Sequence, residues 1–538
     1  MIILGIADGA DASAALMVNN ELVAAVTEEA ARRVRGAWGF PSAAVDAVLD
    51  IAGIRPRDVD RVVFAGVFTP AAVLRARPGL RRDPAPGEWA RGVQSVLRKT
   101  GLYMVDAGAA RGVLEKRLRA QGFEAAFVDT IEHDRAHTTV AYRTQPREEL
   151  LLCTLDSPGD GACLSVSVAK HLQIDTVHVQ TALASAATFP ARIAKILNVP
   201  ETELEWVAAG EPGEALLNRL RSELHYEGPG FNRLPLRRGP DPLTAFAAEG
   251  PLLAEAALRV MSEAFRACVA DHIRRTGIAH VGVAGSLWSP RLLSELAEIP
   301  GLESLWVPPM PGDAGLSVGA VLATAGTVTQ RLRDPCLGPR YAEDACYRAL
   351  SNASLPREAV ADPDEEAAIL LSEGKTVARF AGPLEFSARG LGNRDFLCST
   401  AQSGARLSEL LRLSGPAPVG VALRAEFAEA AFPGIGKVAN SARFQTVALR
   451  PSAAFAAAHP GALRGDGRML PQVVHEQDDP SFYRLLAAYE RRSGRQALTQ
   501  VNLARPGLPV AASPADAVGA WRDSRADALF LGPYRVLR

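Results

Sequence analysis

Ile2-Ile-Leu-Gly-Ile-Ala7, followed directly by Asp8-Gly-Ala-Asp11, opens the chain with an apolar run that ends in two acids. A short apolar run bounded by turn residues is typical of a buried strand, so we predict a strand over 2–7 and a turn over 8–11. Residues 14–17 and 22–27 are apolar again, and the Asn19-Asn20 pair between them favours a hairpin turn. The chain is therefore expected to begin with three strands joined by tight turns.

A second hairpin of this kind is predicted about 150 residues later. Residues 150–155 and 162–169 are expected to be strands, and the turn between them again carries two acids, Asp156 and Asp160. Two such hairpins indicate two pseudo-symmetric halves. The arrangement resembles the ASKHA fold of actin, sugar kinases and Hsp70, in which the tight turns present backbone N–H groups to phosphate. We therefore expect a bound nucleotide to lie near Asp8, Asp156, Gly159 and Asp160.

The remaining elements are predicted from apolar periodicity and from helix start and stop signals. The expected helices are 42–53, 107–121, 252–276, 315–325, 364–373, 478–494 and 514–524, the last with Ser513 as its N-cap. The expected strands are 61–68, 125–129, 280–285, 302–307 and 375–381. Prolines accumulate and the periodicity weakens around 328–365. We therefore predict an α/β protein of two domains, residues 1–345 and 346–538.

Glu132-His-Asp-Arg-Ala-His137 contains two histidines four residues apart, His133 and His137. A helix presents positions i and i+4 on one face, so both imidazoles can reach the same ion. Asp313, in the distant run Gly312-Asp-Ala-Gly315, is a candidate third ligand. Such a set suits a divalent transition metal, iron(II) or zinc above magnesium. The alternatives are solvent-facing or capping histidines and, for Asp313, a helix cap.

Composition narrows the classes of partner and compartment. The 538 residues carry a formal net charge of −1, with 59 basic and 60 acidic side chains, so nothing favours nucleic acid or a charged membrane surface. No apolar run reaches the roughly 18 residues that span a bilayer, and no signal peptide is recognised, so the cytoplasm is expected. The six cysteines form no Cys-x-x-Cys motif, which argues against a disulfide framework. Cys153 and Cys163 are expected to be buried small side chains rather than nucleophiles.

Longer motifs extend these observations over the chain. Gly5 to Leu16 is similar to GIN-x-x-HDASAAL, His133 to His137 to HHxxHA, Asp156 to Asp160 to DGxGE, and Gly312 to Gly315 to GDAG. Leu384 to Arg394 is similar to MEFGPRALGNRS, and Ala439 to Val447 to VDGTARVQTV. In these motifs the chain resembles, nearly end to end, the nodulation-protein and cephamycin-type carbamoyltransferases.

The resemblance implies two catalytic units. A C-terminal YrdC-like domain would make carbamoyl adenylate from carbamoyl phosphate and ATP with magnesium. An N-terminal ASKHA-type domain would hold that adenylate beside iron(II) or another divalent metal. It would pass the carbamoyl group to a hydroxyl or amine of a small-molecule or peptide acceptor in specialised metabolism. The resemblance also suggests a homodimer. The further nucleotide or donor contacts that we expect are Gly285, Gly312, Arg389, Asn393, Arg394, Arg443 and Gln445.

Several polar positions of the family pattern are substituted here. Ala10 stands in place of a histidine, Arg35 in place of a lysine, and Asp134 in place of the second histidine of HHxxHA. Loss of a positioned base typically costs about 10²–10⁴-fold in rate. The acceptor is then an amine that needs no base, or Asp134 is the base, or activity is lost. We expect Asp11, Arg35 and Asp134 to be the catalytic residues.

Two rival functions remain. One is a drifted nucleotide-binding or scaffold paralogue of a biosynthetic pathway, which the substitutions motivate. The other is a plain ASKHA kinase or ATPase, which leaves the chain after residue 350 unexplained.

Overall fold

The computed structural model describes residues 1–77, 88–124, 126–233, 240–325, 334–399, 409 and 419–538. Contacts divide the chain into two compact units. The first comprises Met1–Val23, Trp38–Val45 and Gly53–Arg331, and the second comprises Ala24–Ala37, Asp46–Ala52 and Leu332–Arg538. The domain boundary expected between residues 345 and 346 falls inside α13 (Glu343–Asn352), which packs in the core of the second unit. Within the described part of the chain, no helix has the length and apolar character needed to cross a membrane.

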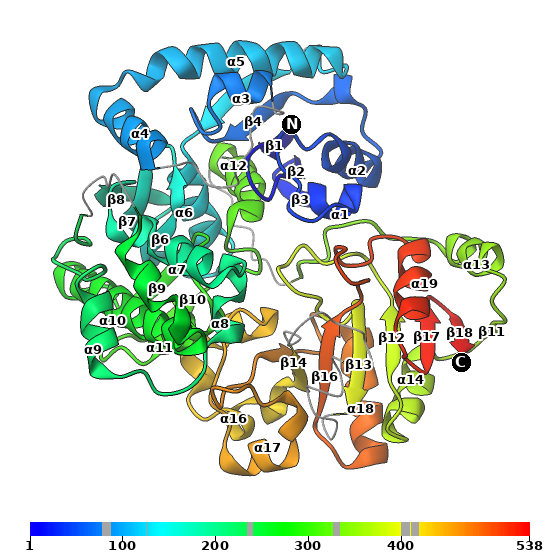
Figure 1. The fold of residues 1–538 in the computed structure, drawn as a ribbon. Helices are drawn as coiled ribbons and strands as arrows, with labels where there is room; N and C mark the ends of the chain where they lie inside the picture. Colours follow the sequence, from blue (N-terminus) through cyan, green and yellow to red (C-terminus); the bar gives the residue numbers. More distant parts are fainter. Residues whose placement is uncertain (78–87, 125, 234–239, 326–333, 400–408, 410–418) are drawn as a thin grey trace. The chain divides into compact units, whose positions relative to one another are not determined.

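The first sheet begins with the predicted N-terminal hairpins (Figure 1). Its strands are β1 (Ile2–Ala7), β2 (Ser13–Val18), β3 (Glu21–Thr27), β4 (Arg61–Ala65) and β5 (Phe127–Ile131), in the order β3-β2-β1-β4-β5. β1 pairs antiparallel with β2 and parallel with β4, and β4 pairs parallel with β5. Asn19 and Asn20 have φ angles of 50° and 68°, as a type I′ hairpin turn requires.

The second sheet repeats this pattern. Its strands are β6 (Glu149–Gly159), β7 (Ala162–Lys170), β8 (Gln173–Thr181), β9 (His280–Ala284) and β10 (Ser304–Trp306), in the order β10-β9-β6-β7-β8. β6 pairs antiparallel with β7 and parallel with β9, and β9 pairs parallel with β10. The β7–β8 turn also has two consecutive residues with positive φ, His171 and Leu172. This duplication is the ASKHA arrangement that the two hairpins predicted.

Two helices of the first unit bring its functional segments together, α6 (His133–Arg143) and α12 (Leu316–Thr324). α12 contacts β1, β2 and β4 of the first sheet, α6 contacts β6 and β9 of the second, and the two helices pack against each other. The crossing is close because Gly319 of α12 has no side chain; a Cβ there would lie 2.2 Å from the Ala136 carbonyl oxygen of α6. Ser13 of β2 donates a hydrogen bond to the Ala314 carbonyl oxygen (2.7 Å), which fixes the segment just before α12.

The first unit contains further helices. They are α3 (Ala72–Ala76), α4 (Glu88–Thr100), α5 (Tyr103–Ala120), α7 (Phe189–Leu197), α8 (Leu204–Val207), α9 (Glu214–Arg221), α10 (Pro251–Thr276) and α11 (Pro290–Ala297). Two further helices, α1 (Glu28–Arg32) and α2 (Ser42–Ala52), follow the first three strands.

The second unit is built on a mixed sheet ordered β11-β18-β17-β12-β13-β16-β14-β15. The strands are β11 (Glu358–Ala359), β12 (Val377–Phe380), β13 (Arg394–Ser399), β14 (Gly420–Arg424), β15 (Pro471–Val474), β16 (Ala497–Asn502), β17 (Ala528–Leu531) and β18 (Tyr534–Leu537). One core packs α14 (Pro363–Ser372) and α18 (Pro480–Ser493) on the sheet, and another packs α13 and α19 (Pro514–Asp523). Short helices α16 (Ala428–Ala431) and α17 (Ala453–Ala458) complete this unit. The predicted α/β fold class, with two duplicated sheets followed by a second α/β unit, is confirmed.

Two local predictions are wrong. The acidic turn expected over 156–161 is mostly strand, because β6 continues through a register shift to Gly159 and leaves Asp160 and Gly161 to turn. The strand expected over 61–68 ends at Ala65, because the following Gly66 has φ 103°. Residue 125, at the start of a predicted strand, lies outside the described residues, and that strand runs from Phe127.

Candidate metal centre

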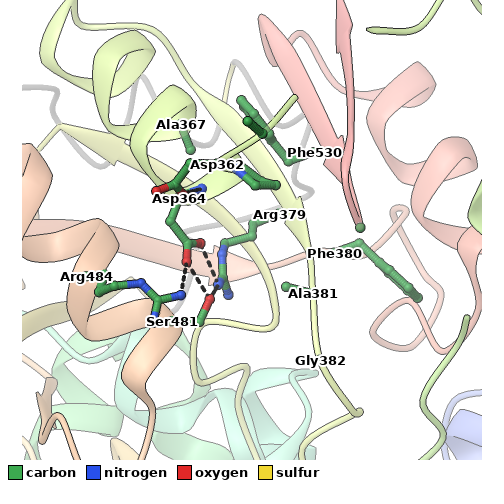
Figure 2. Close-up of a pocket in the computed structure, with 13 residues that line it drawn as sticks. Asp362, Asp364, Ala367, Arg379, Phe380, Ala381, Gly382, Ser481, Arg484 and Phe530 are labelled. Carbon is green, nitrogen blue, oxygen red and sulfur yellow. Dashed lines mark hydrogen bonds and ion pairs between the residues drawn. The ribbon is translucent and has the colours of Figure 1, made fainter. Parts of the chain in front are cut away.

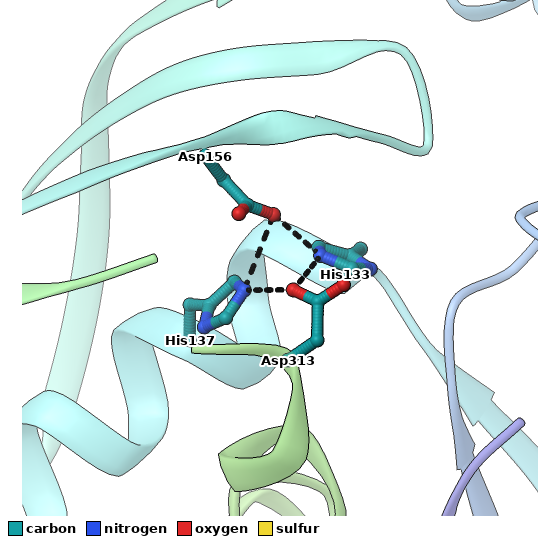
Figure 3. A group of neighbouring side chains, drawn as sticks. All are labelled: His133, His137, Asp156 and Asp313. Atoms are coloured by element: carbon teal, nitrogen blue, oxygen red, sulfur yellow. Dashed lines mark hydrogen bonds and ion pairs between the residues drawn. The ribbon is translucent and has the colours of Figure 1, made fainter. Parts of the chain in front are cut away.

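Four buried side chains converge in the first unit (Figure 3). His133 and His137 come from the first turns of α6, Asp156 from β6, and Asp313 from the turn before α12. His133 Nε2 lies 2.7 Å from Asp156 Oδ2 and 3.5 Å from Asp313 Oδ1. His137 Nε2 lies 3.3 Å and 3.4 Å from the same two oxygens. The predicted metal set is thus brought together, with Asp156 as a fourth member where sequence reasoning expected a nucleotide contact.

The donor set fits a divalent cation. Its four ligand atoms lie within 4.8 Å of one another. Both nitrogens of His137, and Oδ1 of Asp313, are buried and make no hydrogen bond of good geometry with any described residue. Buried polar atoms without such bonds are costly, and a cation at their centre would satisfy them. Two imidazoles and two carboxylates suit iron(II), zinc or manganese better than magnesium.

The pKa shifts of His133, His137 and Asp156 also favour a positive charge between the four side chains. Burial alone would lower the pKa of both histidines, but the two carboxylates raise the pKa of His137 and raise that of His133 well above its usual value. Burial opposes ionisation of Asp156 too, yet the imidazoles hold its pKa well below the usual range. The two carboxylates therefore favour positive charge among these side chains, and a divalent ion would supply such a charge.

Gly159 and Asp160 support His133 rather than forming an open phosphate turn. A Cβ on Gly159 would lie 2.3 Å from Cγ and Cδ2 of the His133 ring. Asp160 is fully buried, and its carboxylate accepts hydrogen bonds from the backbone N–H groups of His133, Val67 and Phe68. Asp160 thereby caps α6 and joins it to the segment after β4.

Asp8, expected near a nucleotide, is engaged by the protein itself. Its carboxylate forms a two-pronged ion pair with Arg75, with Nε–Oδ2 at 2.9 Å and Nη2–Oδ1 at 3.1 Å. Both side chains are buried, and Arg75 also donates to the Gly66 carbonyl oxygen at 2.7 Å. Sequence reasoning missed Arg75, because a single arginine 67 positions from its partner leaves no local signal.

The three expected catalytic residues are dispersed. Asp134 is buried on α6 and lies 3.4 Å from Arg98 of α4, which also bonds the Asp160 carbonyl oxygen at 2.9 Å. Asp11 is exposed in the first turn with φ 45°. Arg35 is exposed in the second unit, where its Nε donates to the Leu508 carbonyl oxygen at 3.2 Å.

Gly285 and Gly312, which we expected to contact the nucleotide or donor, lie where backbone segments pass close to one another near the candidate metal centre. Gly285, just after β9, has φ 112°, and a Cβ there would lie 2.2 Å from the Leu155 carbonyl oxygen of β6. Its N–H donates to the Pro311 carbonyl oxygen at 2.7 Å, which ties β9 to the segment carrying Asp313. Gly312 precedes that aspartate, and the nearest atom to a Cβ there is the Ser286 Cα, at 4.0 Å.

In the second unit, the segment 389–394 is fixed by hydrogen bonds to other residues of that unit. Glu385 accepts from the Leu391 and Asn393 N–H groups, and Gln445 Nε2 donates to the Gly390 carbonyl oxygen at 2.7 Å. Arg394 is completely buried; its guanidinium bonds the carbonyl oxygens of Ala381, Gly382 and Asn393. Arg443 forms an ion pair with Asp478 at 2.5 Å. Arg389, in the same segment, is partly exposed.

A cavity of about 420 Å³ lies elsewhere on this unit, by the N-termini of α14 and α18 (Figure 2). Asp364 accepts from Arg379 at 3.0 Å and from Ser481 at 2.6 Å, and the Arg484 guanidinium lies 3.4 Å from it. None of the residues expected to bind nucleotide or donor lines this cavity. Arg379 and Arg484 both contact Asp364, whereas the Asp362 side chain caps α14.

The cysteines follow expectation. All six are free thiols. Cys153 and Cys163 are buried on β6 and β7, and burial raises the pKa of Cys153 to about 12. Neither thiol is therefore poised as a nucleophile.

The strand order and the clustered ligands define a duplicated ASKHA-type protein with a candidate metal centre and a second α/β unit. Residues 368–538 match the family described as Carbamoyltransferase C-terminus. The chain is 22% identical over 568 residues to nodulation protein NolNO of Sinorhizobium fredii, covering 98% of this chain and 78% of that protein. The chain is thus similar to carbamoyltransferase-family proteins, and the family match itself covers residues 368–538.

Two uncharacterized proteins of Methanocaldococcus jannaschii are also similar to this chain, over different lengths. MJ1051 is 22% identical, with 99% of each chain covered. MJ1058 is 27% identical, but the match covers 44% of this chain and 40% of that protein.

Two solved structures align at low scores. The activator of the 2-hydroxyisocaproyl-CoA dehydratase from Clostridium difficile is 13% identical with a TM-score of 0.33, covering 60% of this chain and 94% of its own. HypF of T. kodakarensis is 11% identical with a TM-score of 0.30, covering 61% and 48%.

Proposed function

We propose that this protein is an ATP-dependent carbamoyltransferase. The second unit would convert carbamoyl phosphate, ATP and water into carbamoyl adenylate, with release of inorganic phosphate and pyrophosphate. The first unit would transfer the carbamoyl group to a hydroxyl or amine of a small molecule or peptide, with AMP as the leaving group. The observation that carries the proposal is the convergence of His133, His137, Asp156 and Asp313 in a chain whose C-terminal third matches a carbamoyltransferase family.

The chemistry suits these residues. Carbamoyl transfer passes through a tetrahedral oxyanion, and a divalent metal such as iron(II), held by the four side chains, would supply a Lewis acid for the carbonyl oxygen. Because AMP leaves readily, the protein's part is mainly positioning. Asp160 and Gly159 fix the start of α6, so both histidines are held in place before a substrate arrives.

Ala10 offers no base in the opening turn, which favours an amine acceptor. Asp134 is the alternative base; its carboxylate lies on α6 beside His133 and 3.4 Å from the Arg98 guanidinium. Transfer to an amine should not depend on Asp134, whereas transfer to a hydroxyl should. An Asp134→Asn variant should transfer normally to an amine but lose about 10²–10⁴-fold toward a hydroxyl.

The test separates the two half-reactions. Purified protein with carbamoyl phosphate, ATP and magnesium should release pyrophosphate and form carbamoyl adenylate, detected by mass spectrometry. A His137→Gln variant should keep this activity, because His137 lies in the first unit, but should no longer carbamoylate any compound in a metabolite extract. Absence of pyrophosphate release, with or without iron(II), would refute the proposed function.

Two contacts favour a second candidate, a protein that binds nucleotide without turning it over and acts as a scaffold. Asp8, just after the central strand β1, forms an ion pair with Arg75, and the Arg394 guanidinium bonds backbone carbonyl oxygens rather than facing a ligand. The scaffold predicts nucleotide binding by calorimetry without release of pyrophosphate, together with co-purification of a pathway enzyme. Pyrophosphate release that depends on carbamoyl phosphate would exclude it.

A further inference from the structure

Asp156 presents its two carboxylate oxygens to different partners. Oδ2 faces His133 and His137, whereas Oδ1 turns toward Ser286. The Ser286 N–H donates to Oδ1 at 2.8 Å, and the Ser286 hydroxyl makes a second, shorter hydrogen bond to the same oxygen. One oxygen is therefore saturated by donors, while the other is left for the centre.

The direction of the serine hydroxyl follows from its other contact. The Ser157 N–H donates to Ser286 Oγ at 3.1 Å. The Ser286 oxygen thus accepts from one side and must place its single hydrogen on the other, toward Asp156 Oδ1 or the more distant Ser157 Oγ at 3.2 Å. Donation to the carboxylate is the stronger bond because the acceptor is charged.

The strand register puts Ser286 in this place. β6 and β9 run parallel with Thr154 opposite Ala284, so two residues further on Ser286 lies beside Asp156. The intervening Gly285 bonds the segment that carries Asp313 through the Pro311 carbonyl oxygen. This one turn after β9 therefore contacts both segments that supply carboxylates.

We infer that Ser286 is a positioning residue that fixes Asp156 as a one-oxygen ligand of the metal. The inference rests on the metal centre of the proposed function and adds to it the residue that orients one carboxylate. Without the hydroxyl, Oδ1 keeps one donor, and the carboxylate can rotate so that both oxygens approach the ion. Groups that orient ligands in this way typically govern about 10–100-fold in metal affinity.

The test measures binding of iron(II) alone, under anaerobic conditions, to the full-length protein by competition with a chelator. Ser286→Ala should weaken the affinity by about 10–100-fold. Ser286→Thr, which keeps the hydroxyl, should restore it. Ser157→Ala is the matched control, because it removes a neighbouring hydroxyl but leaves both bonds to Asp156, and it should bind iron as the unmodified protein does. Ser286 is exposed, so these variants should unfold at the same temperature in chelator.

Cobalt(II) gives a readout of the geometry itself. The Ser286→Ala variant should show weaker visible absorption than the unmodified protein, because a second Asp156 oxygen raises the coordination number. Equal iron affinity and equal cobalt spectra for Ser286→Ala would overturn the role of Ser286 and leave the metal centre standing. Failure of the unmodified protein to bind iron would instead overturn the metal centre and this inference with it.

Discussion

Gly159 lies against the imidazole of His133 so closely that a Cβ would fall 2.3 Å from two ring atoms. The contact joins the end of β6 to the start of α6, the two elements that supply three of the four candidate ligands. The absence of a side chain at one residue thus determines where another residue's ring can sit.

A Gly159→Ala substitution should displace the His133 ring. Overpacking of this kind typically costs about 1–3 kcal/mol, and we expect iron(II) affinity to fall at least about tenfold. Chelator competition and urea unfolding measure the two effects. Gly312→Ala is the matched control, since a Cβ there meets nothing nearer than 4.0 Å, and it should alter neither quantity. A Gly159→Ala protein with unchanged affinity would contradict the importance of the contact.

Metal removal should destabilise the first unit. A ligand that binds only the folded state adds about 2.7 kcal/mol when its concentration is 100 times its Kd. We therefore expect the thermal transition to shift upward on adding iron(II) or zinc and to return with chelator, as followed by calorimetry. His137→Gln should abolish the shift; persistence of the shift in that variant would place the binding elsewhere.

Breaking the Asp8–Arg75 pair should be costly. Arg75→Met leaves a buried carboxylate without its cation, and such losses typically cost about 3–5 kcal/mol. Urea unfolding measures the change. The partly exposed pair Arg111–Glu115 provides the comparison, because Arg111→Ala should cost no more than about 1 kcal/mol. If the two variants lost similar free energies of unfolding, burial would not make the Asp8–Arg75 pair more important for stability than the exposed pair.

The second unit should lose stability toward alkaline pH. Burial, with Glu385 nearby, raises the pKa of Asp395 to about 8. Between its ordinary value near 4 and pH 8, the folded state holds a proton that the unfolded state has released. The free energy of unfolding therefore falls as pH rises through this window, by up to about 1.4 kcal/mol per unit, and levels off above pH 8.

Asp395→Asn provides the check on this pH dependence. The amide cannot ionise, so urea unfolding from pH 5 to 9 should show a shallower slope than in the unmodified protein. An identical slope in both proteins would assign the pH dependence to other groups.

The fold was largely readable from local signals. The Asn19-Asn20 turn, the two acid-bearing hairpins and the long helix over 252–276, observed as Pro251–Thr276, follow from periodicity and turn chemistry. Predictions failed where tertiary contacts decide the backbone. The register shift in β6 depends on its pairing with β7, and it moves Asp156 from a turn into a strand.

The candidate site was predictable only in part. The helical spacing of His133 and His137 is a local signal, and the structure places both beside Asp313 as expected. Metal binding itself stays a prediction. Arg75 and Ser286 were missed, because each acts on a partner distant in sequence, 67 positions in one case and 130 in the other. The polar contacts around Arg394 were hidden for a different reason: its partners are backbone carbonyls, which no residue type reveals.

The duplicated sheets give this chain an internal comparison. Each central strand has an aspartate near its C-terminal end: Asp8 directly follows β1, and Asp156 lies within β6, which ends at Gly159. In the first half the countercharge is the buried guanidinium of Arg75, which also bonds the Gly66 carbonyl oxygen. In the second half it is a pair of imidazoles, which are also candidate metal ligands. The same place in the two halves thus carries a cation that is part of the protein in one case and a candidate site for an exchangeable metal ion in the other.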